Sequence, residues 1–291
     1  GREPRSEGLS MPEYVLSLEC DERRGIVHSL TGALLEHGGD IRELKQFDDA
    51  LSRRFFLRVE FELETEALED LRSEIEAVAG DLDASWNLWP KGEKRRVLIM
   101  VSKFEHCLND LLFRARIGEL PVEIAAVVSN HPDHRELVEW HHVPFFRIPV
   151  TAETKPEAEA KLLDLVDRFE IDLVVLARYM QVLSDDLARE LTGRAINIHH
   201  SFLPSFKGAK PYHQAYERGV KTVGATAHFV NSELDEGPII AQAVTEVDHA
   251  FGPQDLVAAG RDTECKALSN AVRWHCEGRV FLNGKRTVVL R

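Results

Sequence analysis

The pattern of hydrophobic and polar positions changes near residue 90, and this change predicts two domains. Before residue 90, short segments either alternate with period two or carry apolar residues at helical spacing. After it, continuous apolar runs at 97–102, 123–129 and 173–177 are separated by helical segments. Continuous runs are typical of strands buried on both faces of a parallel sheet. The sequence therefore predicts the α/β class, with a Rossmann-like parallel sheet in residues 97–291.

Residues 11–89 predict a separate small domain with the element order βαββαβ. Tyr14, Leu16 and Leu18 share one face of the first strand, and Ile26, Leu30 and Leu34 form a helical stripe. The third strand alternates cleanly, so Arg58, Glu60 and Glu62 are expected to face water. This order is typical of a ferredoxin-like antiparallel sheet with both helices on one face.

The domain boundary is expected in the charged, Pro- and Gly-containing linker at 90–96. Residues 1–10 are polar, and we expect them to be a disordered lead before Met11. The C-terminal segment "VFLNGKRTVVL" predicts a hairpin that turns at Asn283–Gly284.

Composition narrows the function classes. The formal net charge of −13 argues against nucleic acid or an anionic membrane as a partner, because both reward clustered Lys and Arg. No apolar run approaches the roughly 18 residues of a membrane span, and no signal peptide is recognisable. The four cysteines are far apart in the chain, which favours reduced thiols in the cytoplasm over a disulfide or zinc framework.

The segment "AINIHHSFLPSF" carries the first candidate chemistry. An apolar strand ends in Asn197 and His199, which lie two residues apart and so point the same way. In open α/β sheets, ligands bind beyond the carboxyl ends of the strands. An amide donor and an imidazole together suit a carbonyl that becomes an oxyanion. Alternatively, both side chains satisfy backbone groups at the strand end.

A second segment, "GATAHFVNSELDEGPII", adds His228 on a strand and Asp235 in the turn that follows it. The carboxylate can orient His199 and a water molecule, or it can simply cap the loop before Gly237 and Pro238.

These motifs, N-x-H, L-P-S-F-x-G and D-x-G-P-I-I in this order, resemble the catalytic domain of the folate-dependent formyltransferase family from about residue 95 onwards. The resemblance assigns catalysis to Asn197, His199 and Asp235. It also makes "LARYMQVLS" (176–184) the folate pocket. The substrate-binding residues expected from it are Arg178, Met180, Gln181, Val182, Leu183 and His228.

Residues 11–89 resemble an ACT domain, a module that often binds amino acids as a regulator. Its effector is expected around the first strand–helix turn, at Asp21, Arg24, Gly25 and Ile26, where free N–H groups can receive a carboxylate. A plain helix start without a ligand is the alternative. The resemblance also implies a homo-oligomer, a dimer or a tetramer.

The combined architecture resembles the formyltetrahydrofolate deformylases, which hydrolyse 10-formyltetrahydrofolate to formate and tetrahydrofolate and supply formate to purine and one-carbon metabolism. Formyltransferases that use a ribonucleotide acceptor carry a Gly-rich loop for its phosphate. Here "VSKFEHCLNDLL" (101–112) contains no glycine, which favours water as the acceptor. A transferase with a non-phosphorylated acceptor and a non-catalytic folate or amino-acid sensor are the alternatives.

A metal or further cofactor is not expected, and folate enters only as the substrate. The adjacent His199 and His200 suggest a metal site with His213 or His228. Neighbouring strand residues face opposite ways, however, and no zinc-ligand spacing supports this.

Overall fold

The computed structural model describes residues 11–201, 211–233 and 235–291, and these residues form two compact units. The first unit contains the chain up to Glu93 together with 278–283 and 288–291. The second contains 94–277 and 284–287. The expected lead 1–10 and the L-P-S-F-x-G motif at 203–208 lie outside the described residues.

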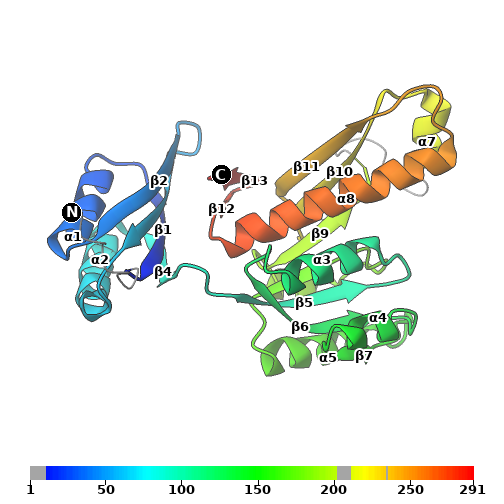
Figure 1. Ribbon diagram of the computed structural model, residues 1–291, viewed down its shortest axis with the longest axis horizontal. Coiled ribbons are helices and arrows are strands. Elements are labelled where there is room, and N and C mark those ends of the chain that lie inside the picture. Colours follow the sequence, from blue (N-terminus) through cyan, green and yellow to red (C-terminus); the bar gives the residue numbers. More distant parts are fainter. Residues whose placement is uncertain (1–10, 202–210, 234) are drawn as a thin grey trace, which may run out of the picture. The chain divides into compact units, whose positions relative to one another are not determined.

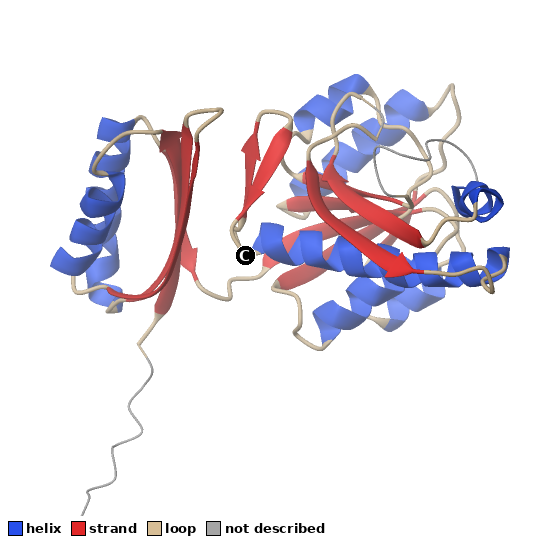
Figure 2. Ribbon diagram, turned by 90° about the horizontal axis from the view of Figure 1, so that it is seen from above, coloured by secondary structure: helices blue, strands red, loops and turns tan. Residues whose placement is uncertain are grey.

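The first unit has the predicted order of strands and helices. Its antiparallel sheet is ordered β2-β3-β1-β4, and both helices cover one face (Figure 2). Apolar side chains of β1 and β3 pack against α1 and α2 in one core. The elements are β1 Glu13–Asp21, α1 Ile26–Glu36, β2 Asp40–Asp49, β3 Arg54–Glu62, η1 Thr65–Ala67, α2 Leu68–Leu82 and β4 Ser85–Pro90.

The outer face of β3 corrects the expectation that Arg58 and Glu60 face water. Both are buried, at 2% and 8% exposure. Arg58 Nη1 donates to Glu60 Oε1 at 2.7 Å and to Glu43 Oε2 at 3.3 Å. Arg279, from the end of the chain, donates to Glu43 at 3.2 Å. The alternation of β3 gives no sign of this cover, because the covering residues lie more than two hundred positions away.

The covering residues lie in or next to the C-terminal strands β12 (Val280–Asn283) and β13 (Arg286–Val289). The rings of Phe281 and Phe56 lie 5.5 Å apart between centroids, and Leu290 packs in the same cluster. The two residues between the strands are Gly284 and Lys285, one position later than the predicted turn.

The second unit contains a seven-stranded sheet ordered β11-β10-β9-β8-β5-β6-β7. The predicted parallel pairing holds from β9 to β7. The predicted parallel sheet has an exception at one edge, where β10 and β11 run antiparallel. The strands are β5 Arg95–Val101, β6 Val122–Ser129, β7 Phe145–Arg147, β8 Leu173–Leu176, β9 Ala195–His199, β10 Thr222–Phe229 and β11 Ile239–Glu246.

Helices cover both faces of this sheet (Figures 1 and 2). Residues of α5 and α6 pack on alternate side chains of β5, β6 and β8. The long helix α8 runs along β9, β10 and β11 and contacts α3 (Figure 1). No helix within the described ranges has the length and apolar character needed to cross a membrane. The helices are α3 His106–Arg116, α4 Arg135–Trp140, α5 Lys155–Arg168, α6 Asp185–Glu190, α7 Pro211–Arg218 and α8 Pro253–Cys276.

Candidate active site

A cavity of about 710 Å³ lies at the carboxyl ends of β8 and β9, where an open α/β sheet offers a ligand site. Its lining brings together every catalytic and substrate-binding residue predicted from the sequence. These residues are Arg178, Met180, Gln181, Val182, Leu183, Asn197, His199, His228 and Asp235.

Asn197 and His228 meet across the antiparallel pair β9–β10, where they occupy opposite positions. Asn197 Nδ2 lies 3.4 Å from His228 Nε2. His228 Nδ1 lies 2.8 Å from the Phe229 carbonyl oxygen, so this ring nitrogen carries the proton. The other ring nitrogen, Nε2, then faces the Asn197 amide. This contact fixes which way the amide faces.

Asp235 lies between two imidazoles. Its Oδ2 is 3.3 Å from His199 Nδ1, and its Oδ1 is 3.8 Å from His228 Nε2. The contact with His199, followed by that with His228, holds the pKa of the Asp235 carboxyl well below its ordinary value, although burial opposes this. The resting side chain is therefore an anion beside His199.

Gly237 explains how the turn brings Asp235 so close to β10. A Cβ on Gly237 would lie 1.6 Å from the Phe229 carbonyl oxygen and 3.0 Å from His228 Nδ1. Phe229 N–H also donates to the Pro238 carbonyl at 2.9 Å. Only glycine allows this approach of the backbone. The same carbonyl that holds His228 thus lies against the turn carrying Asp235.

His199 presents its second nitrogen without a protein partner. His199 is 5% exposed, and no group of the described residues forms a hydrogen bond with its buried Nε2. With Nδ1 committed to Asp235, Nε2 is the nitrogen available to a bound molecule or a water.

His200 also lines the cavity, its ring centroid 5.1 Å from that of His199. The expectation that the two side chains face opposite ways is wrong, because β9 ends at His199 and strand alternation ends with it. Burial, reinforced by Arg178, lowers the pKa of His200 to about 4, so this ring is neutral at physiological pH.

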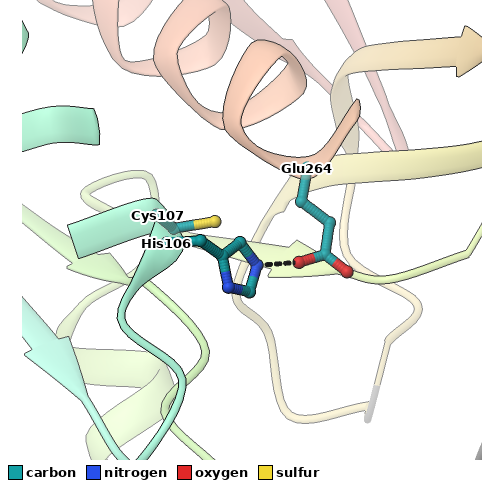
Figure 3. Close-up of side chains that lie close together, drawn as sticks. All are labelled: His106, Cys107 and Glu264. Atoms are coloured by element: carbon teal, nitrogen blue, oxygen red, sulfur yellow. Dashed lines mark hydrogen bonds and ion pairs between the residues drawn. The ribbon is translucent and has the colours of Figure 1, made fainter. Parts of the chain in front are cut away.

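Sequence reasoning missed a buried ionic cluster in the same cavity. Glu264 of α8 is fully buried, and its carboxylate accepts from Arg178 Nη1 at 3.2 and 3.1 Å and from the Tyr212 hydroxyl at 2.8 Å. His106 Nε2 contacts the same carboxylate (Figure 3). Burial alone would raise the pKa of Glu264, but His106, Arg178 and Tyr212 together leave it lowered.

One sequence signal could have revealed Glu264. Gly260, Glu264, Ala267 and Ala271 are buried along one face of α8, so a carboxylate stands on an otherwise small and apolar stripe. Such a charge needs partners in the folded protein. Gly260 also makes room for Tyr212, because a Cβ there would lie 2.1 Å from its hydroxyl.

His106, Cys107 and Glu264 place three potential metal-ligand atoms within 4.8 Å of one another. Figure 3 shows His106 directed at the carboxylate, while no interaction is drawn to Cys107. A hydrogen bond with Cys265, followed by burial, raises the pKa of the Cys107 thiol well above its ordinary value. Arg178 already neutralises Glu264, and a cation would be repelled there. The cluster therefore fits an ion-pair network better than a metal centre.

The segment after β8 exposes apolar side chains while hydrogen bonds hold its backbone in place. Met180 and Val182 are 54% and 56% exposed, which leaves an apolar surface for a flat ring. Met180 N–H donates to Ser102 Oγ at 2.9 Å, and Ser102 N–H donates to the Arg178 carbonyl at 3.2 Å. Gln181 and Leu183 line the main cavity and also a smaller one beside it.

The predicted regulatory residues occupy the β1–α1 turn of the first unit. Gly25 has φ +89° at the start of α1, and no side chain caps this helix. Ile26 is buried, whereas Arg24 is exposed. Asp21 accepts from Arg54 Nη1 at 3.0 Å.

The chain is similar to known proteins in sequence and in fold. The formyl transferase family model matches residues 95–272. The formyltetrahydrofolate deformylase of Corynebacterium sp. (strain P-1) is 68% identical over 280 residues, which cover 96% of this chain and 98% of that protein. The crystal structure of formyltetrahydrofolate deformylase from Burkholderia mallei has a TM-score of 0.93 and 52% identity, covering 96% of this chain and all of that one.

A solved structure with another name matches part of the chain. Glycinamide ribonucleotide transformylase 1 from Symbiobacterium toebii has a TM-score of 0.65 and 32% identity. The match covers 70% of this chain and 98% of that one.

Proposed function

The chain belongs to the formyltetrahydrofolate deformylases within the formyl transferase family, and from this we propose that its cavity hydrolyses 10-formyltetrahydrofolate to formate and tetrahydrofolate. The observation that carries the proposal is the assembly of Asn197, His199 and Asp235 in one cavity beside an apolar segment. The folate ring lies against Met180–Leu183, with Arg178 and His228 at the same site.

In the proposed reaction, water attacks the N10-formyl carbon and the carbonyl oxygen becomes an oxyanion. Asn197 Nδ2 and the protonated Nε2 of His199 donate to that oxygen. His228 supports this step by holding the Asn197 amide. The Asp235 anion holds the imidazolium and the attacking water.

The bond from carbon to N10 then breaks, and a proton from the water passes through Asp235 to N10. Formate and tetrahydrofolate leave. No cofactor or metal enters this scheme, and folate is the substrate.

We assign the first unit to the ACT domains, with the boundary to the catalytic domain in the 90–96 linker. Its βαββαβ order supports this, since the sheet order β2-β3-β1-β4 keeps both helices on one face. An amino-acid effector binds at the β1–α1 turn, near Asp21–Ile26, and the enzyme is a cytoplasmic homo-oligomer. Calorimetric titration with glycine, methionine and other amino acids tests the effector, and absence of heat and of a rate change rejects it.

The test of the activity is incubation with 10-formyltetrahydrofolate alone, followed by measurement of formate. We expect formate to appear without any added amine, and chelators to leave the rate unchanged. Strict dependence on an added amine rejects hydrolysis. Loss of activity with a chelator, restored by zinc, rejects the metal-free scheme.

A further inference from the structure

The cavity has two chemically different sides. One side is the apolar segment Met180–Leu183. The other is lined by Phe104, His106, Arg178, Tyr212 and Glu264, which are aromatic or belong to the buried ionic cluster. A hydrolase must admit water next to the formyl group and exclude larger nucleophiles. The second side of the cavity is where such exclusion can act.

Arg178 is the residue on which this second side is built. It lies two residues after the end of β8 and has φ +63°, a backbone conformation that residues other than glycine rarely adopt. Its side chain is only 10% exposed and is bound by the fully buried Glu264. Its guanidinium also lies 4.5 Å from the centroid of the Phe104 ring. Burial and two partners together fix the position of this side chain, although its backbone conformation is unfavourable.

Phe104 comes from the segment between β5 and α3, where the sequence contains no glycine. Ser102 in the same segment bonds the Arg178 carbonyl and the Met180 N–H. These hydrogen bonds connect the two segments. The Phe104 ring covers the Arg178 guanidinium near the carboxyl end of β5. The side chains of Phe104, His106 and Arg178 line the cavity at this end of β5.

We propose that Arg178, clamped between Glu264 and Phe104, is a specificity-determining residue that closes the cavity to amine acceptors and so reserves the formyl group for water. The inference rests on the proposed hydrolysis. With water, a C–O bond to the formyl carbon forms, the C–N10 bond breaks and a water proton ends on N10. With an amine, a C–N bond forms instead, and the amine proton ends on N10.

The test measures how the formyl group divides between water and glycinamide, a primary amine larger than water. Two variants remove side chains from the second side of the cavity. Arg178→Gly combined with Glu264→Gln removes the guanidinium without leaving an unpaired buried carboxylate, which would be strongly destabilising. Phe104→Ala removes a ring that is 45% exposed and disturbs no ion pair.

The matched control is Phe113→Ala, because Phe113 is 46% exposed, also lies under an arginine and is absent from the cavity lining. We expect wild type and control to produce formate only. Both opening variants should form N-formylglycinamide, at a ratio to formate at least about tenfold above the smallest ratio that the assay detects in wild type.

An unchanged ratio in Phe104→Ala and in the paired variant, each with a normal thermal transition and normal folate binding, overturns the inference. If the paired variant does not fold, Phe104→Ala decides alone. Formylation of glycinamide by wild type at the same ratio also overturns it. Failure of wild type to release formate without amine rejects the proposed function instead, so the two failures are distinguishable.

Discussion

Asn197 Nδ2 lies 3.4 Å from His228 Nε2, and the pairing of β9 with β10 places these residues opposite each other. Because the Phe229 carbonyl holds the other nitrogen of His228, the ring is fixed against the Asn197 amide, which keeps a hydrogen for a substrate. His228 is therefore a positioning residue for an oxyanion donor.

This relationship predicts that the effects of Asn197→Ala and His228→Ala on turnover are not additive. Asn197→Ala should lower kcat by about two to three orders of magnitude, the scale of one lost oxyanion donor. In the absence of Asn197, His228 has no amide to position, so the double variant should be much more active than the product of the two losses implies. Steady-state formate release gives the cycle, with a coupling free energy of about 0.5–3 kcal/mol. Full additivity contradicts the positioning role.

The parts of the site that could be predicted are those whose residues lie close together in the sequence. Asn197 and His199 are two residues apart on one strand, so period-two geometry places them on one face. Strand pairing is not local: nothing in the sequence of β10 shows that it runs antiparallel to β9, and this pairing brings His228 to Asn197.

The same limit explains the other errors. The alternation of β3 correctly predicts the core positions Phe55, Leu57 and Val59, which pack with the helices. It fails for Arg58 and Glu60, because what covers them comes from the far end of the chain. Likewise, Glu264 and His106 are 158 positions apart, and only the fold brings them together.

The C-terminal strands should contribute to the stability of the first unit. Phe281 is 9% exposed and packs on Phe56, whereas its neighbour Leu282 is 39% exposed. Phe281→Ala should lower the free energy of unfolding by about 3 kcal/mol, as expected when a buried aromatic ring is removed. Leu282→Ala should have less than a third of that effect. Urea unfolding of both variants checks this, and equal effects would show that Phe281 packs no better than a surface residue.

His200 should make stability depend on pH in a defined window. Its pKa falls from 6.5 to about 4 on folding, with burial as the main cause. As pH falls through this interval, the unfolded chain takes up the proton first, so stability is lost from 6.5 down to about 4 and is fully present above 6.5. His200→Gln does not titrate there and should lose less. Thermal unfolding at about pH 7.5 and about pH 5 measures the difference. A constant gap between wild type and variant would contradict the prediction.

Gly237→Ala should impair the site more than the fold. The new Cβ collides with the Phe229 carbonyl, so the turn carrying Asp235 must move away from β10. We expect a loss of at least about tenfold in kcat and a free-energy cost of about 1–3 kcal/mol for the overpacking. Gly252→Ala is the control, since its Cβ would approach no closer than 3.5 Å to Asp255 Oδ2. Near-normal turnover of Gly237→Ala would mean that the close approach of the turn is not needed.

Asp235→Asn separates the catalytic role of this carboxylate from loop capping. The substitution keeps the shape and removes the charge that faces His199 at 3.3 Å. Without the anion, the imidazolium is less favoured and the water loses its acceptor, so kcat should fall by at least about two to three orders of magnitude. Binding of the folate should change far less, because Met180–Leu183 are untouched.

The control for this substitution is Asp248→Asn. Asp248 Oδ1 accepts from Ala250 N–H at 2.7 Å in an exposed turn, which is the capping role that Asn fulfils equally well. If Asp235 were only a cap, both variants would keep most of their activity. The structure favours the other outcome, since the Asp235 oxygens approach two imidazoles and the pKa of this carboxyl is lowered by them. An Asp235→Asn enzyme with wild-type thermal stability and near-normal formate release would remove Asp235 from the mechanism.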